Sequence, residues 1–139
     1  MKTESGAVHV RWNEQPDDHP MPLLARKRVI GQQAMISRVF LKKGCDIPTH
    51  AHENEQIAIV ISGKARFGLG AEGSAARSEL IVGADEVLHL PSNVPHSRYA
   101  MEDTLIIDVF SPPSQKTGID RPSPLPGREG LGEGRSAGT

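Results

Sequence analysis

Along most of the chain, hydrophobic and polar positions alternate with the period of a β-strand. Short runs rich in Val, Ile and Leu recur at intervals of roughly 8 to 12 residues, as in many-stranded β proteins, and Gly, Pro, Asn and Asp separate them. Helical periodicity is hard to find. The sequence therefore predicts an all-β sandwich or barrel.

Individual strands follow from the same pattern. We expect an N-terminal strand over residues 7–12, because Val8, Val10 and Trp12 alternate with polar neighbours. An irregular Pro-rich crossing follows. The further strands are expected at residues 33–44, at 56–70 as two strands divided by a turn at Ser62-Gly63, and at 77–83, 86–91, 94–100 and 104–111.

Composition divides the chain into three parts. Residues 1–25 form the N-terminal strand and irregular arm, and residues 26–113 hold the strands of a barrel. Residues 114–139 are rich in Pro and Gly and have almost no bulky apolar groups, so they cannot bury enough surface to offset the entropy of ordering. We expect this tail to be disordered.

Charge and cysteine content narrow the class of protein. Sixteen Lys and Arg against 17 Asp and Glu leave a net charge of -1 without a basic block, which argues against a nucleic-acid partner. The longest apolar run, Ile57–Ile61, is far too short to span a membrane, and the first residues lack a signal-type segment. The single cysteine, Cys45, allows no internal disulfide, and we interpret it as a turn residue rather than a nucleophile. A cytoplasmic protein is expected.

Three histidines in two separate stretches predict a metal site. His50 and His52 are one residue apart, so on a strand they point to the same side and can chelate one ion. His96 follows a Pro-bracketed turn in which Asn93 can take a positive φ. Three imidazoles from distant strands are a normal transition-metal site, whereas His9, His19 and His89 are interpreted as ordinary surface or core residues. The sequence cannot choose among zinc, nickel, manganese, cobalt and iron.

The fourth ligand is either Gln56 or Glu55. Gln56 has the same parity as the two histidines, and Glu55 has the opposite parity. A Gln ligand beside three neutral imidazoles leaves the full charge of a divalent ion in place, which favours anionic substrates. It also departs from the two-His-one-carboxylate arrangement of oxygen-activating iron enzymes.

These spacings resemble the two cupin motifs. The stretch from Gly44 to Gly63 resembles the first, with Gln56 in the place of the usual Glu, and "GADEVLHLPSNVPH" at residues 83–96 resembles the second. The resemblance covers about residues 26–113. It implies a double-stranded β-helix, or jelly-roll barrel, with one divalent metal ion inside its mouth.

The end of the barrel resembles the small cupins of the pectin-degradation type, which convert cyclic 4,5-unsaturated uronates into linear keto acids. This implies a metal-assisted isomerisation or ring opening without redox change. Asp108 is the candidate acid-base group, since it shares a face with Ile106 and Phe110 and matches an Asp-x-Phe pattern of that type. The alternative is a buried Asp satisfied by backbone donors or by an Arg.

The same resemblance implies groups that bind an acidic substrate. Phe110 matches the pattern, but the Arg that follows it in that type is Ser114 here, and a frequent Tyr is Ile59. Arg98 and Arg38 are candidates to replace the missing carboxylate clamp, because the planar guanidinium binds a carboxylate with two hydrogen bonds.

Two other functions and an oligomeric state are also considered. The missing Arg and Tyr favour a non-catalytic cupin that binds a small molecule, and a quercetinase-like dioxygenase is the third alternative. We expect a homodimer, because the N-terminal strand and the apolar face formed by Leu105, Ile107 and Val109 would otherwise expose much hydrophobic surface.

Overall fold

The computed structural model describes residues 1–114, which form one short helix and nine strands. The elements are the 3-10 helix η1 (Trp12–Glu14) and the strands β1 (Leu24–Ile30), β2 (Met35–Leu41), β3 (Asp46–His50), β4 (Glu55–Ser62), β5 (Lys64–Leu69), β6 (Ser78–Gly83), β7 (Glu86–Leu90), β8 (His96–Ala100) and β9 (Thr104–Ser111). No helix in this part of the chain is long and apolar enough to cross a membrane. The tail predicted at residues 114–139 lies, from residue 115 onward, outside the described residues.

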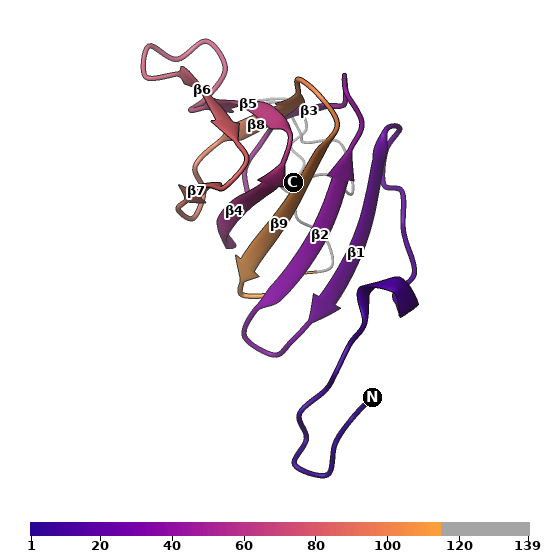
Figure 1. Cartoon of the computed structure of the whole chain (residues 1–139). Coiled ribbons are helices and arrows are strands. Elements are labelled where there is room, and N and C mark those ends of the chain that lie inside the picture. The colour runs from indigo at the N-terminus through magenta and orange to yellow at the C-terminus, as the bar shows by residue number, and fades with distance from the viewer. Residues whose placement is uncertain (115–139) are drawn as a thin grey trace.

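The strands form two antiparallel sheets. One sheet has the order β1-β2-β9-β4-β7 and the other the order β3-β8-β5-β6. The chain passes from one sheet to the other several times, and the sheets lie in separate layers (Figure 1). The predicted all-β jelly-roll barrel is confirmed.

The core lies between the two sheets. Side chains alternate along each strand, and the inward set is almost fully buried. Its largest apolar members include Val39 and Leu41 of β2, Val60 of β4, Phe67 of β5 and Ile106 of β9. These side chains fill one part of the barrel, and the rest of the interior holds buried polar side chains beside apolar ones such as Ile47 and Phe110.

The turn between β4 and β5 depends on Gly63. This residue has a φ of +91°, and an added Cβ would collide with the backbone oxygen of Asp103. Only glycine adopts such a conformation without strain or steric conflict. The turn expected at Ser62-Gly63 is confirmed, and so is the positive φ of Asn93, which is +67°.

The N-terminal strand predicted at residues 7–12 is wrong. In this segment Val8 makes only an isolated bridge with Lys2, Trp12 begins η1, and the first residues extend away from the sheets (Figure 1). A strand needs a neighbour to pair with along its length, and this segment has none among the described residues. The alternating pattern alone did not reveal that this segment lacks a strand to pair with in the described part of the chain.

The first true strand is β1, which the hydrophobic pattern missed. Its sequence, LARKRVI, contains three consecutive cations that interrupt the apolar alternation. Arg26 is nevertheless buried, because its Nε and Nη2 donate hydrogen bonds to the two carboxylate oxygens of Asp18 at 3.0 and 2.7 Å. Pairing with a carboxylate allows a cation to occupy an inward position.

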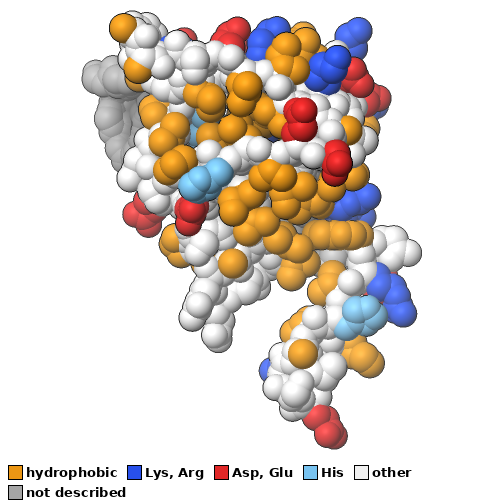
Figure 2. Space-filling model, turned by 60° about the vertical axis from the view of Figure 1, so that its left-hand side comes forward, with side chains coloured by type: hydrophobic (Ala, Val, Ile, Leu, Met, Phe, Trp, Pro, Cys, Tyr) orange, Lys and Arg blue, Asp and Glu red, His pale blue; other side chains and the backbone are white. Residues whose placement is uncertain are grey.

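The outer face of the five-stranded sheet is apolar. Outward side chains on β4 and β9 include Ile57, Ile59, Ile107 and Val109, and Figure 2 shows hydrophobic side chains gathered over the middle of one face. Val87 on the edge strand β7 is 60% exposed. The homodimer expected from this apolar face stays a prediction.

Candidate metal centre

The candidate metal ligands come from both sheets. His50 ends β3 and His96 begins β8, and the two are cross-strand partners in the four-stranded sheet. Gln56 is the second residue of β4 in the opposite sheet. His52 lies in the connection just after β3, not on a strand as expected, so a loop rather than strand alternation brings it to the same side as His50.

The three imidazoles are close together. The possible ligand nitrogens of His50, His52 and His96 all lie within 4.8 Å of one another. The rings of His50 and His96 have centroids 4.5 Å apart, and both residues are buried. Three His nitrogens at this spacing can hold one metal ion.

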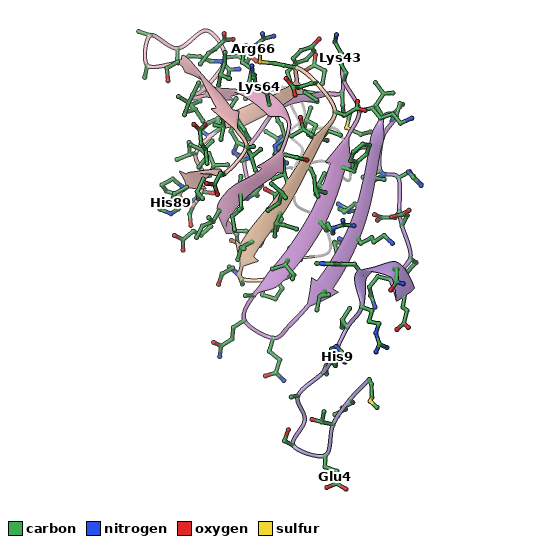
Figure 3. The ribbon with its side chains drawn as sticks, viewed as in Figure 1. Glu4, His9, Lys43, Lys64, Arg66 and His89 are labelled. Atoms are coloured by element: carbon green, nitrogen blue, oxygen red, sulfur yellow. The ribbon has the colours of Figure 1, made fainter. Side chains whose placement is uncertain are left out.

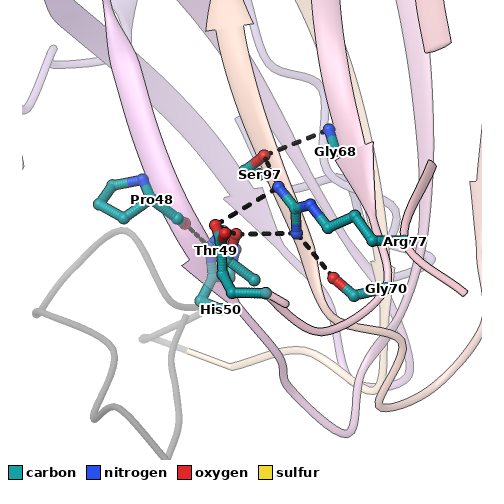
Figure 4. A network of polar contacts seen from close by, with 8 residues as sticks. Pro48, Thr49, His50, Gly68, Gly70, Arg77 and Ser97 are labelled. Carbon is teal, nitrogen blue, oxygen red and sulfur yellow. Dashed lines mark hydrogen bonds and ion pairs between the residues drawn. The ribbon is translucent and has the colours of Figure 1, made fainter. Parts of the chain in front are cut away.

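Hydrogen bonds fix the tautomer of each ring. The Nδ1 atom of every one of these histidines faces a nearby backbone carbonyl. The distances are 2.8 Å from His50 to Pro48 (Figure 4), 3.0 Å from His52 to Asn54 and 2.9 Å from His96 to Val94. A carbonyl only accepts, so Nδ1 carries the proton and Nε2 keeps its lone pair. This is the second-sphere arrangement typical of metal-binding histidines.

Two of these Nε2 lone pairs, those of His52 and His96, receive no hydrogen bond from a donor among the described residues. The Nε2 of His96 is buried and has no hydrogen-bond partner among the described residues. The Nε2 of His52 lies 3.1 Å from the Oε1 of Gln56, whose own Nε2 donates to Asp108 at 2.9 Å. Two acceptors therefore face each other, which is unfavourable unless a cation is bound between them. The residues fit a metal ion.

The protonation states also suit metal binding. Burial lowers the pKa of His50 well below its ordinary value, and the neighbouring His96 lowers it further. Burial likewise lowers the pKa of His96 to about 4, and it lowers that of His52. Neutral imidazole is the form that binds metals, so these rings are ready as ligands near pH 7.

A small cavity adjoins the ligands. Its volume is about 20 Å³, which is roughly the space that one or two water molecules need. The residues that line it are Ile47, His50, Gln56, His96, Arg98, Asp108 and Phe110. The cavity has room for an ion and a water, so most of a larger substrate has to lie on its solvent side, with only the reacting atoms inside the cavity.

The comparisons with known proteins agree with this geometry. The family model for the cupin domain matches residues 37–110, which include all four candidate ligands. The chain belongs to the cupin family. No curated protein matches it.

Several solved cupin structures are similar to this cupin. An RmlC-like cupin from Shewanella frigidimarina has a TM-score of 0.69 and 20% identity, and the match covers 78% of this chain and 95% of that one. KdgF from a Halomonas species has a TM-score of 0.65 and 27% identity over 73% and 92% of the two chains. Oxalate decarboxylase from Bacillus subtilis has a TM-score of 0.64 and 20% identity over 72% of this chain and 28% of that one.

Asp108 lies in the cavity of this cupin and is paired with an Arg, as in the alternative considered from the sequence. Its two carboxylate oxygens accept hydrogen bonds from Nη1 and Nη2 of Arg98 at 2.9 and 2.8 Å. Both residues are buried, with 2% and 5% exposure, and the guanidinium lies 5.0 Å from the ring centroid of Phe67. The bidentate fork of Arg98 is therefore used by Asp108 and is not free to hold a substrate carboxylate.

Phe110 and Arg38 lie on opposite faces of the five-stranded sheet. Phe110 is buried in the cavity, and its ring centroid lies 5.7 Å from that of His52. Arg38 instead points outward, where its guanidinium lies 5.9 Å from the ring of Trp12. The prediction that Arg38 clamps a substrate is wrong for this cavity, because the odd-numbered residues of β2 are the inward ones.

Glu55 lies outside the site. Its carboxylate is 2.6 Å from the Nε2 of His89, and both side chains are about half exposed. His89 lies at the edge of the barrel and His9 on the N-terminal arm, both on the outside of the molecule (Figure 3). Gln56, which is buried beside His52, is the residue at the ligand position.

Arg77 supports the His50 end of β3 from outside and was not predicted. Its guanidinium donates to Thr49, Gly70 and Ser97, and so links the strand that carries His50 to its neighbours (Figure 4). It lies so close over Gly68 that an added Cβ would collide with it. No spacing rule in the sequence connects these residues.

Two further residues near the site act in packing. Asn54 is buried and its amide donates to the backbone oxygen of Pro112, which fixes the loop after His52 against the end of β9. Cys45 is part of the core, and burial raises the pKa of its thiol. A buried thiol of raised pKa is a poor nucleophile, and the N–H of Cys45 donates to the oxygen of Lys42, in keeping with its interpretation as a turn residue rather than a nucleophile.

Proposed function

We propose that this cupin binds one divalent metal ion through His50, His52, Gln56 and His96 and isomerises or opens the ring of a small acidic sugar or keto acid. The observation that carries the metal site is the convergence of three imidazoles, in which the buried Nε2 of His96 has no hydrogen-bond partner among the described residues and the Nε2 of His52 faces another acceptor. Zinc, nickel, manganese, cobalt and iron all accept this ligand set. Because every ligand is neutral, the bound ion would supply its full positive charge to polarise and hold substrate oxygens.

Asp108 is the proposed acid-base group of this reaction. Its Oδ1 accepts two hydrogen bonds, from Gln56 and from Arg98, whereas Oδ2 accepts only one, from Arg98. Oδ2 thus retains a lone-pair site that can take the proton of the anomeric hydroxyl as the ring C–O bond breaks. The same proton can then be given to a carbon of the substrate's double bond, which converts the enolate into a ketone without loss of any atom. Such a transfer needs no oxidant, and Phe110 provides an apolar wall beside it.

The substrate class is supported by similarity as well as by chemistry. The two motifs resemble those of small cupins of the pectin-degradation type, and KdgF from Halomonas shares 27% identity with the chain. An acidic substrate also suits an ion that keeps its full charge.

A specific observation favours a second candidate, a cupin that binds a small acid without turning it over. Arg98 is the one Arg among the described residues that line the cavity, and its fork is occupied by Asp108. Position 114, where the pectin-degradation type carries an Arg, holds Ser114. A dioxygenase is the third candidate, and Gln56 in place of a carboxylate ligand counts against it.

The test is to incubate the metal-loaded protein with a 4,5-unsaturated uronate and to follow the loss of its ultraviolet absorbance. The isomerase proposal predicts metal-dependent loss, none with His50→Ala, and unchanged dissolved oxygen. Bound metal and bound uronate without turnover would replace the isomerase by the binding protein. Oxygen consumption coupled to substrate loss would favour the dioxygenase.

A further inference from the structure

The amide of Gln56 has a direction that its surroundings determine. Its Nε2 lies 2.9 Å from Oδ1 of Asp108, and its Oε1 lies 3.1 Å from Nε2 of His52. A side-chain amide can turn by about 180°, which exchanges its donor and acceptor ends. Only the orientation that points Oε1 at the histidines makes Gln56 a metal ligand.

Asp108 forces that orientation. An ionised carboxylate only accepts hydrogen bonds, so it requires the NH2 end of Gln56. Asp108 itself cannot turn away, because Arg98 holds both of its oxygens in a buried, bidentate ion pair. Asp108 lies on β9, diagonally across from Gln56 on β4, so the strand register keeps the two groups together.

We propose that Asp108, held by Arg98, is a positioning residue that orients the Gln56 amide and presents its oxygen to the metal. This inference rests on the metal site proposed above. It also gives a physical reason for Gln rather than Glu in the first motif. A carboxylate at position 56 would place a second anionic oxygen against Asp108, with no hydrogen between them.

The pair Asp108 and Gln56 therefore sets the charge of the site. The negative charge is on Asp108, which contacts the ligand Gln56 but is not itself a ligand, and Arg98 balances it. The four ligand side chains remain neutral. The expected consequence is a bound ion that attracts an anionic substrate more strongly than it would with a carboxylate ligand.

Asp108→Asn is the main test variant, since it keeps the size of the side chain. Arg98 faces both oxygens of Asp108, so either orientation of the new amide leaves its NH2 against one N–H of Arg98. In the metal-free protein the orientation with this NH2 toward Gln56 is favoured, because it lets Gln56 donate a hydrogen bond to the Nε2 of His52 in place of a contact between two acceptors. Gln56 must then accept this hydrogen bond with Oε1 and turn its own NH2 toward the histidines. The affinity for Co²⁺, measured by equilibrium dialysis, should fall about 10- to 100-fold, as for other residues that orient metal ligands. The visible spectrum of bound Co²⁺ should change as well.

Gln56→Glu in the Asp108→Asn background separates orientation from general damage. The carboxylate introduced at position 56 can accept a hydrogen bond from the amide introduced at position 108 with one oxygen and offer the other to the ion. Co²⁺ affinity should therefore return at least to the level of the unsubstituted protein. The matched control is Asp18→Asn. It weakens another bidentate Asp-Arg pair, with Arg26, that does not line the cavity, so Co²⁺ affinity should not change.

The outcomes distinguish the inference from the proposed metal site. If the unsubstituted protein binds no Co²⁺, or if His50→Ala binds it equally well, the metal site itself is wrong. If Co²⁺ binding depends on His50 but Asp108→Asn binds with the same affinity and spectrum, the positioning role of Asp108 is overturned. Weaker binding in Asp108→Asn with no recovery in the double variant also overturns it.

Discussion

Near the candidate metal site, strands β4 and β9 have polar side chains on their inner face and apolar side chains on their outer face, the reverse of an ordinary half-buried sheet. Inside the barrel, Gln56 and Asp108 are polar and buried, and they bond to each other. Outside it, Ile57 and Ile107 are apolar and only partly buried. Strands normally place apolar residues inward and polar residues outward. The inner face departs from this pattern at Gln56 and Asp108, whereas Val60 and Ile106 keep the rest of it apolar, and the outer face departs from it through its exposed apolar side chains.

Each departure has its own physical explanation. The inner polar groups are tolerated because Arg98 and Gln56 both donate hydrogen bonds to Asp108, which leaves the oxygen of Gln56 facing the histidines. The outer apolar groups have no such explanation within one chain. We expect a second copy of the chain to cover them, because in a two-fold dimer the same face of each copy can pair with the other.

The largest expected effect follows from breaking the buried ion pair between Arg98 and Asp108, called the inner pair below. Arg98→Met leaves the buried carboxylate of Asp108 without its cation, which should cost about 3–5 kcal/mol in the free energy of unfolding. Urea denaturation measures this cost. Arg38→Met, on the outer face of β2, is the control and should change stability by less than about 1 kcal/mol. Equal stabilities for the two variants would mean that the inner pair contributes nothing special.

Acid should lower the free energy of unfolding of the metal-free protein, because the buried histidines of the candidate metal site are neutral in the folded chain. The pKa of His96 is about 4 in the folded chain against an ordinary 6.5, so between these values the unfolded chain takes up a proton that the folded chain does not. Stability is therefore full above pH 6.5 and falls as the pH drops toward 4. The loss from His96 is about 3 kcal/mol, and the lowered pKa values of His50 and His52 act in the same direction.

Chemical denaturation at a series of pH values tests this dependence. His96→Gln should show a smaller loss between pH 6.5 and pH 4, because it removes one of the three titrating groups whose pKa is lowered by burial. A stability profile that is flat in this range for the unsubstituted protein would contradict the burial of neutral imidazoles.

The next prediction tests whether the apolar outer face of the five-stranded sheet forms the interface of a homodimer. Ile107→Lys would place two charges in the interface of a two-fold dimer and should raise the dimer dissociation constant about 100-fold, or about 2.7 kcal/mol. Sedimentation velocity measures the change. Ile81→Lys, at a 52% exposed position on β6 of the other sheet, is the control and should leave association unchanged. A monomer before substitution would remove the explanation offered for the apolar face.

The smallest expected effect concerns Ser37, an inner polar residue that takes no part in the hydrogen bonds to Asp108. Its hydroxyl is buried opposite Asp108 and has no partner among the described residues. Ser37→Ala should therefore leave stability unchanged or raise it by up to about 1 kcal/mol, because no hydrogen bond is lost. A clear loss of stability in thermal melting would show that the hydroxyl has a partner after all.

The sequence predicted the residues of the candidate metal site better than their surroundings. The two spaced motifs pointed to the three histidines that the fold brings together, although His52 lies in a loop rather than on a strand. Of the two candidates for the fourth ligand, Gln56 faces the histidines and Glu55 lies outside the site. The pairing of Asp108 with Arg98 was raised only as one alternative for a buried Asp. It depends on how β8 and β9 pack across the barrel, which no local spacing reveals.

The choice between Arg98 and Arg38 shows why strand faces are hard to assign. On β2, Met35 and Val39 alternate with Ile36 and Phe40, so both faces are apolar and the pattern does not say which is inward. The strand predicted at residues 7–12 was wrong for a related reason. Alternation shows that a segment suits a strand, but it does not show whether a neighbouring strand is there to pair with it. The fold class needed neither detail and was predicted correctly.

Metal content tests the central claim most directly. The purified full-length chain and His96→Ala would be loaded with Zn²⁺, dialysed and measured by plasma mass spectrometry at a known protein concentration. The ligand geometry predicts one ion per chain in the unsubstituted protein and almost none in His96→Ala. No metal in the unsubstituted protein, or equal metal in the two, would contradict the assignment of His50, His52, Gln56 and His96 as a metal centre.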